Sequence, residues 1–73
     1  MSKIYVEKIR NKYIPGTKVE LLEDMKEEKG MPKGLCGAVD FVDDIGSIHT
    51  TWSNGWILAI IPGLDSFKKY KSR

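Results

Sequence analysis

The sequence is poor in the residues that build disulfides, metal centres and nucleophilic active sites. Cys36 is the only cysteine and His49 the only histidine in 73 residues. A single cysteine excludes the intrachain disulfides on which small secreted domains usually depend, so a reducing, cytoplasmic location is predicted. One cysteine and one histidine cannot complete a zinc site within one chain, and beyond the turn aspartates no acid is evident that could orient a Cys36–His49 dyad. We therefore predict no catalytic residue, no metal and no cofactor, and expect the protein not to be an enzyme.

Long apolar runs are also missing. The longest unbroken run, Trp56–Ile61, is far shorter than the ~20 apolar residues that span a bilayer. The first 13 residues alternate charged and apolar side chains, whereas a signal peptide has a continuous apolar centre. A membrane-spanning or exported protein is therefore not expected.

The composition that is present fits one small folded domain, with 41% hydrophobic and 30% charged residues. The charge is distributed unevenly along the chain. Residues 1–13 carry four basic side chains and one acidic one, residues 66–73 carry four basic side chains only, and residues 14–65 carry four basic and nine acidic ones. The two basic ends indicate either an anionic partner such as nucleic acid or a device for solubility.

Proline and glycine divide the chain into segments. Residues 1–14 are predicted to form an N-terminal helix or extension, in which apolar residues recur at helical spacings: Tyr5, Val6, Ile9 and Tyr13. Pro15 and Gly16 then end the helix. Residues 15–67 are predicted to form a small, mainly β barrel and residues 68–73 a basic C-terminal tail.

The barrel is predicted to contain about five short antiparallel strands, and clear strand patterns cover four segments: Thr17–Leu22, Leu35–Asp43, Ser47–Trp52 and Trp56–Ile61. Val19 and Leu21 alternate with charged residues and are expected in the core. The charged segment Glu23–Gly34 is predicted to be a long exposed loop. Pro62–Asp65 is predicted to form a short helical turn.

Two local features are expected around the second strand. If Val39 is buried together with Val42, rather than with Phe41, their spacing of three residues predicts a bulge near Asp40. The following segment, Asp43–Ser47, is typical of a turn in which aspartate side chains accept hydrogen bonds from backbone amides and Gly46 has a positive φ.

The last hairpin has two possible registers. A two-residue turn at Asn54–Gly55 would set Trp52 opposite Ile57, whereas a three-residue loop with Gly55 in the left-handed conformation would set Trp52 opposite Trp56. We favour the three-residue loop because it gathers the largest apolar side chains on one face. Trp52 is then expected in the core and Trp56 at a partly exposed position beside the tip.

The order of these motifs resembles a family of domains of unknown function found mainly in short proteins of prophages and conjugative elements. The resemblance covers Tyr13 to Phe67 and rests on the following segments: Pro15–Leu21, Gly34–Val39, Val42–His49, Trp52–Gly55 and Pro62–Phe67. It implies an SH3-like barrel with no activity to transfer. The run from Gly34 to Asp43 is also similar to the KOW element of ribosomal and transcription-elongation proteins, whose SH3-like barrels often contact RNA or protein.

We therefore expect a noncatalytic binding module. Docking of a protein or peptide is the first hypothesis, and the predicted contact residues are Trp56, Asn54, His49 and Tyr13. Nucleic-acid binding is the alternative, with four basic residues on phosphates, Lys68, Lys69, Lys71 and Arg73, and Trp56 or Tyr70 stacking on bases. A third interpretation is a homo-oligomer or a piece of a larger assembly, and the sequence leaves the oligomeric state open.

Overall fold

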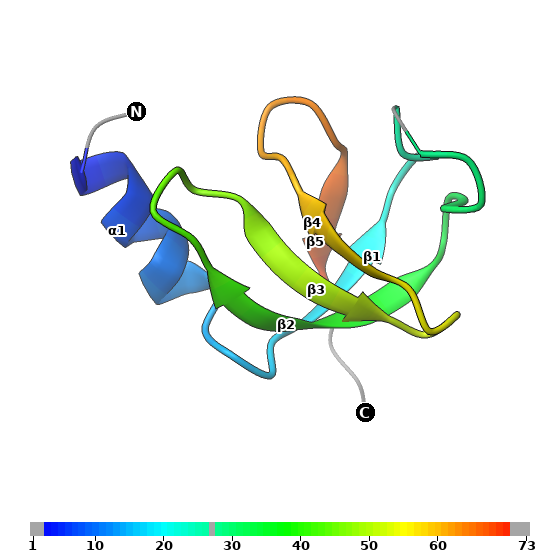
Figure 1. Ribbon diagram of the computed structural model, residues 1–73, viewed down its shortest axis with the longest axis horizontal. Helices are drawn as coiled ribbons and strands as arrows, with labels where there is room; N and C mark the ends of the chain where they lie inside the picture. The colour runs from blue at the N-terminus through cyan, green and yellow to red at the C-terminus, as the bar shows by residue number, and fades with distance from the viewer. Residues whose placement is uncertain (1–2, 27, 71–73) are drawn as a thin grey trace.

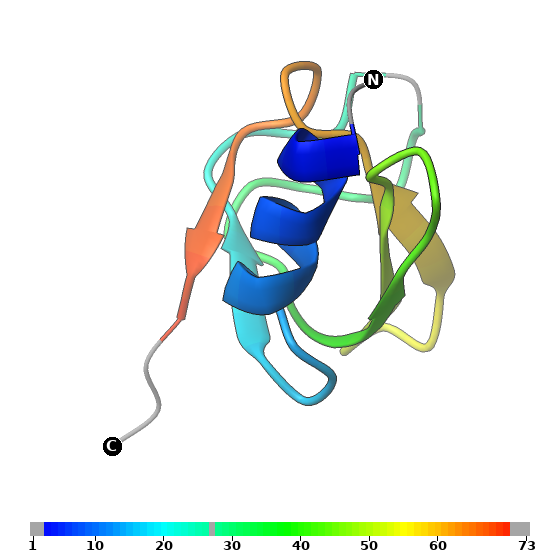
Figure 2. The same ribbon diagram turned by 90° about the vertical axis from the view of Figure 1, so that its left-hand side faces the viewer.

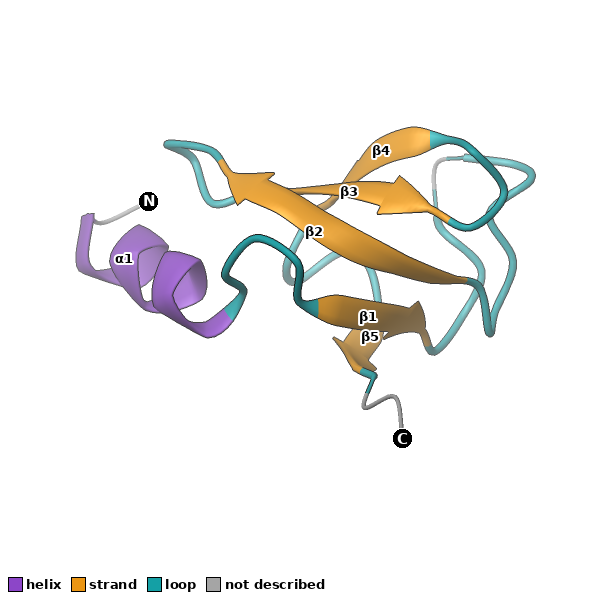
Figure 3. Cartoon of the chain, turned by 90° about the horizontal axis from the view of Figure 1, so that it is seen from below, coloured by secondary structure: helices purple, strands orange, loops and turns teal. Residues whose placement is uncertain are grey.

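In the computed structural model, residues 3–26 and 28–70 are described, and they form one helix and five strands. These are α1 (Lys3–Lys12), β1 (Lys18–Leu21), β2 (Cys36–Val42), β3 (Ile48–Trp52), β4 (Ile57–Ile60) and β5 (Phe67–Lys69). The strands make a single antiparallel sheet in the order β4-β3-β2-β1-β5 (Figures 1 and 3). The predicted mainly β fold with a short N-terminal helix is confirmed. In this part of the chain no helix is long and apolar enough to pass through a lipid bilayer.

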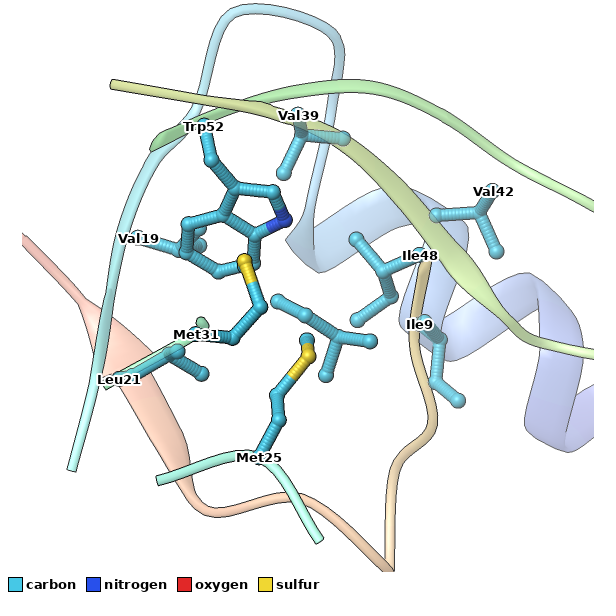
Figure 4. Close-up of a cluster of buried hydrophobic side chains, with 10 residues drawn as sticks. Ile9, Val19, Leu21, Met25, Met31, Val39, Val42, Ile48 and Trp52 are labelled. Atoms are coloured by element: carbon cyan, nitrogen blue, oxygen red, sulfur yellow. The ribbon is translucent and has the colours of Figure 1, made fainter. Parts of the chain in front are cut away.

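One face of the sheet packs on a core that draws side chains from α1, from the first four strands and from the β1–β2 loop (Figure 4). Val19 and Leu21 are buried on β1, as their alternation predicted. Trp52 is central, with 2% of its surface exposed. Its indole nitrogen is satisfied, because Nε1 donates to the carbonyl of Leu58 at 3.1 Å.

The helix lies across one end of the sheet (Figure 1). Its apolar stripe buries Val6 and Ile9. On the same helix, Arg10 Nη2 donates to the carbonyls of Val42 and Asp43, each at 3.2 Å. Because these acceptors lie at the end of β2, both packing and hydrogen bonds fix α1 to the sheet.

The bulge and the hairpin register are confirmed. The β2–β3 register shifts between Val39 and Phe41, so that Val39 and Val42 both face the core and Phe41 faces outward. In the β3–β4 hairpin, the amide of Trp52 donates to the carbonyl of Trp56 at 2.8 Å. Gly55 has φ +90°, as the three-residue loop requires.

The predicted loop Glu23–Gly34 is exposed at most of its described residues, but two of its side chains are not. Met25 and Met31 are buried in the core, and the amide of Met25 donates to the carbonyl of Met31 at 2.9 Å, which closes the loop on itself. A small domain has little apolar volume, and flexible methionine side chains fill the remaining space under a charged loop.

The C-terminal segment also differs from prediction. The expected helical turn is a single hydrogen-bonded turn in which the amides of Leu64 and Asp65 both donate to the carbonyl of Ile61 at 3.0 Å. Phe67–Lys69 then pairs with β1 as β5, so the predicted boundary between barrel and tail, at residues 67 and 68, falls inside a strand. Pairing through the backbone lets this basic segment join the sheet, because the free edge of β1 needs hydrogen-bond partners whatever the side chains are.

Candidate functional site

The four residues predicted to contact a partner lie in three separate places. Asn54 and Trp56 are at the β3–β4 hairpin, His49 is on the outer side of β3, and Tyr13 follows α1. Of the residues predicted for nucleic acid, Lys68 and Lys69 belong to β5, while Lys71 and Arg73 lie outside the described residues. The structure therefore does not gather the predicted residues into one site.

Asn54 and Trp56 join the hairpin to the β1–β2 loop, residues 22–35. Asn54 Nδ2 donates to the carbonyl of Gly30 at 3.2 Å, and its Oδ1 accepts the amide of Trp56 at 3.1 Å. The indole of Trp56 lies against Gly30, where an added Cβ would come within 3.3 Å of the ring. Trp56 is 43% exposed, as predicted. Its contacts with Gly30 and Asn54 give this tryptophan a structural role in packing the hairpin against the loop.

An apolar patch covers the outer face of β2, β3 and β4. Strand pairing places Phe41 beside His49 and His49 beside Ala59. Phe41 and Ile57 are 52% and 69% exposed, and Ile61, directly after β4, is also exposed. We call Phe41, His49, Ile57, Ala59 and Ile61 the outer-sheet patch.

His49 is held in the outer-sheet patch by two contacts. Its ring stacks on that of Phe41 with centroids 4.3 Å apart and planes inclined by 7°. Its Nε2 donates to Asp43 Oδ2 at 2.8 Å. The other carboxylate oxygen, Asp43 Oδ1, accepts the amides of Ile45 at 3.1 Å and Ser47 at 2.9 Å, which confirms the predicted turn chemistry.

The same contacts set the charge of Asp43. Partial burial acts to raise the pKa of this carboxyl, but the hydrogen bonds from His49 and from the amides of Ser47 and Ile45 outweigh it. The pKa therefore lies below its ordinary value of 3.8. Asp43 remains a carboxylate near neutral pH and acts as the acceptor that orients His49.

A second surface lies where α1 and the segment that leads into β5 run side by side (Figure 2), and side chains from both line a groove there. It encloses about 290 Å³, and its lining includes Tyr5, Lys8, Lys12, Tyr13, Pro62 and Phe67. The rings of Tyr13 and Phe67 are in contact, with centroids 5.3 Å apart. The ammonium groups of Lys12 and Lys69 lie 5.5 and 5.7 Å from the centre of the Tyr13 ring. We call this surface, with Lys69 at its rim, the α1–β5 groove.

Sequence reasoning assigned Tyr13 to protein docking and Lys69 to nucleic acid, whereas the structure brings the two side chains together. It assigned none of Tyr5, Lys8 and Lys12 to a binding site, and it used Tyr5 only as part of the apolar stripe of the helix. Their spacing of three and four residues places them on one face of a helix, and this pattern could have predicted a shared surface. The other side of the groove could not be predicted in this way, because β5 has only three residues and shows no recognisable strand pattern.

The positions of Cys36 and His49 in the sheet test the only nucleophile–base pair that the sequence offers. Cys36 lies at the end of β2 where Gly37 pairs with Trp52, while His49 pairs with Phe41 towards the other end. The two members of the only possible dyad are therefore kept apart along the strands. Within residues 3–26 and 28–70, no group of three or more histidine, cysteine, aspartate or glutamate side chains is placed to hold a metal ion.

Comparison with known protein families identifies a match over most of the chain. A family model described as a domain of unknown function (DUF4314) matches residues 2–70. No curated protein and no solved structure is significantly similar to the chain. The matched range includes α1 and all the strands from β1 to β5, so the family's domain corresponds to the whole folded unit.

Proposed function

The chain belongs to the family of domains of unknown function DUF4314, and we propose that it is a noncatalytic module that docks another protein through the outer-sheet patch. An SH3-like barrel is part of this proposal. It is supported by the antiparallel order in which β1 to β4 follow one another and β5 returns to pair with β1. A mobile-element origin is also proposed, on the sequence resemblance, and neighbouring replication, packaging or transfer genes would support it.

The exposed apolar side chains of the outer-sheet patch carry the proposal. Phe41, Ile57 and Ile61 are large and apolar, and they are exposed on one face of neighbouring strands. Contiguous apolar surface of this kind marks sites of protein contact. The edge strand β4 borders the patch, and its unpaired backbone groups offer a partner hydrogen bonds as well as apolar area.

His49 provides a polar group within this apolar surface and so makes it more specific for a partner. It lies between Phe41 and Ala59 in the strand order, and the bond to Asp43 fixes the plane of its ring. A polar group held rigidly inside an apolar surface selects partners that place a hydrogen-bonding group opposite it. The patch therefore suits a defined protein surface better than general hydrophobic adsorption.

Capture from host lysate by the immobilised protein tests the proposal. The double variant Phe41→Glu/Ile57→Glu should lose the captured protein, since two charges are then placed in the contact. The matched control is Ile4→Glu/Ile14→Glu, which adds the same two charges at exposed isoleucines of α1 and of the α1–β1 connection and should retain the captured protein. An identical profile for all three proteins, with unchanged folding by circular dichroism, would contradict the proposal.

Self-association is the competing use of the same patch. Light scattering of the purified wild type distinguishes it from docking of another protein. A doubled mass that Phe41→Glu/Ile57→Glu returns to that of one chain would assign the patch to a homodimer.

Nucleic-acid binding is a second candidate function, and a different observation favours it. The two basic ends of the chain, distant in sequence, meet at Tyr13, because the ammonium groups of Lys12 and Lys69 both lie within 6 Å of the centre of its ring. This surface shares no residue with the outer-sheet patch.

A further inference from the structure

We propose that the α1–β5 groove binds single-stranded nucleic acid, with lysines on the phosphates and aromatic rings against the bases. The inference rests on the second candidate function and is independent of the outer-sheet patch. The fold itself supplies the main argument. The basic residues lie mainly in the first 13 and last 8 residues of the sequence, and the contact of Tyr13 with Phe67 brings the described parts of both ends to one side of the molecule (Figure 2).

The lysines of the groove are not engaged in ion pairs within the described part of the chain. No carboxylate there lies within ion-pair distance of Lys8, Lys12 or Lys69. By contrast, Lys68 is 4.0 Å from Glu20. The contacts of Lys12 and Lys69 with the Tyr13 ring hold the ammonium groups in place without neutralising them.

The distances fit a short stretch of a nucleic-acid strand. Since Lys12 and Lys69 Nζ both lie within 6 Å of the Tyr13 ring centre, at 5.5 and 5.7 Å, they cannot be further apart than about 11 Å. At a rise of ~3.4 Å per nucleotide in a stacked strand, this upper limit corresponds to about three nucleotides. The two lysines are therefore close enough to contact phosphates of one short stretch.

The floor of the groove provides rings for stacking. Tyr5, Tyr13 and Phe67 contribute to its lining, and the enclosed volume of about 290 Å³ admits a flat base. Stacking on aromatic side chains inside a basic groove is how proteins hold single strands without reading their sequence. A duplex keeps its bases inside, so it would use the lysines alone and bind more weakly.

The acidic side chains at the opposite end of the molecule direct a negatively charged ligand towards the groove. The β1–β2 loop carries exposed Glu23, Asp24 and Glu28 and lies at the end of the molecule away from α1 (Figure 1). A polyanion is repelled from that end and attracted to the groove. An acidic peptide would experience the same field, but it does not repeat a flat ring beside every negative charge, as a nucleotide chain does.

Fluorescence anisotropy with the full chain tests the proposal. The probes are labelled 15-nucleotide oligo-dT and oligo-U, a duplex of equal length and a poly-glutamate peptide. We expect the single strands to bind at 50 mM salt and the duplex to bind more weakly. For three lysine–phosphate contacts, the affinity for single strands should fall about 20-fold between 50 and 200 mM salt.

Variants locate the site. Lys8→Gln/Lys12→Gln/Lys69→Gln should abolish most of the binding, whereas Lys26→Gln/Lys29→Gln/Lys33→Gln, with the same change of net charge in the β1–β2 loop, should leave it within about twofold. Tyr5→Leu should weaken binding about fivefold or more if a base stacks on this ring. Circular dichroism checks that each variant is folded.

Three results would overturn the proposal. These are no binding of either oligonucleotide at 50 mM salt, equal losses in the two triple-lysine variants, and binding of poly-glutamate as tight as that of oligo-dT. The last result would assign the groove to acidic protein segments. None of them affects the outer-sheet patch, because capture from lysate with Phe41→Glu/Ile57→Glu measures a different surface.

Discussion

At the scale of single residues, Gly37 shows most directly how little free space the core has. A Cβ at this position would lie 2.8 Å from both Trp52 Cε3 and the carbonyl oxygen of Thr51. We expect Gly37→Ala to lower the free energy of unfolding by about 1–3 kcal/mol, since a packed core resists an added carbon. Urea unfolding measures the loss, and near-ultraviolet circular dichroism should show a changed environment of Trp52.

Gly16→Ala is the control for Gly37→Ala, because it adds the same methyl group at a position with free space around it. No atom lies within 4 Å of the position of its added Cβ, and only the φ of +91° opposes the substitution. A cost of about 1–2 kcal/mol from the left-handed conformation is expected, with the Trp52 signal unchanged. A Trp52 signal that Gly37→Ala also leaves unchanged would contradict the steric explanation.

A single residue, Asp43, also makes the stability of the fold depend on pH. Because its pKa is lowered in the folded protein, the carboxylate stabilises the fold above the unfolded pKa of about 3.9 and loses this effect as the pH falls through the folded value. Asp43→Asn should be less stable at pH 6 by about 1 kcal/mol, through the weaker bond to His49. Below pH 4 the difference from wild type should shrink.

Urea unfolding of both proteins from pH 2.5 to 6 measures this effect. Asp40→Asn is the control, because Asp40 Oδ2 accepts a hydrogen bond from Thr51 Oγ1 at 2.7 Å and has no contact with His49 among the hydrogen bonds of the described residues. A stability difference between wild type and Asp43→Asn that stays constant over the whole pH range would show that the carboxylate charge has no such role.

At the scale of structural elements, Asn54 links the β3–β4 hairpin to the β1–β2 loop. Asn54→Ala removes the bond to the Gly30 carbonyl and the acceptor of the Trp56 amide. A loss of about 1 kcal/mol is expected, together with faster hydrogen exchange of the Met25 amide, which is bonded within the loop. Ser53→Ala, at the adjacent position of the hairpin tip, should change neither quantity. Equal exchange rates in both variants would refute the link.

The elements that were predictable are those in which local pattern and tertiary environment agree. Val19 and Leu21 alternate with polar residues and are buried together. Val39 and Val42 both point inward only because of the bulge between them. Turn chemistry at Asn54–Gly55 left two registers, and the need to gather the largest apolar side chains on one face decided between them.

The elements that were missed depend on partners distant in sequence. Met25 and Met31 lie in a charged stretch with Gly30 and Pro32, and only the space beneath the loop makes them core residues. The short strand β5 exists because β1 offers it an edge. The α1–β5 groove could not be predicted for the same reason, since Tyr13 and Lys69 meet only once β5 has paired. His49, in contrast, could be recognised as a surface strand residue from its neighbours alone.

At the scale of the whole molecule, α1 is a part of the core and not an appendage. It supplies Val6 and Ile9 to the interior and holds the end of β2 through Arg10. The division into a helix at residues 1–14 and a barrel at 15–67 therefore separates segments that share one hydrophobic interior. It follows that the sheet should not be stable without the helix.

Deletion of residues 1–12 tests this dependence. Burial of Val6 and Ile9 contributes about 1.5–3 kcal/mol each, while a domain of this size has a total stability of about 4–11 kcal/mol. We expect the truncated chain to be largely unfolded at 25 °C by circular dichroism. In the full chain, Val6→Ala/Ile9→Ala should reproduce most of the loss, whereas Ile4→Ala/Lys8→Ala on the exposed side of α1 should cost less than about 1 kcal/mol. Cooperative urea unfolding of the truncated chain, with a stability within 1 kcal/mol of the full protein, would show instead that the sheet and its loops form a complete core by themselves.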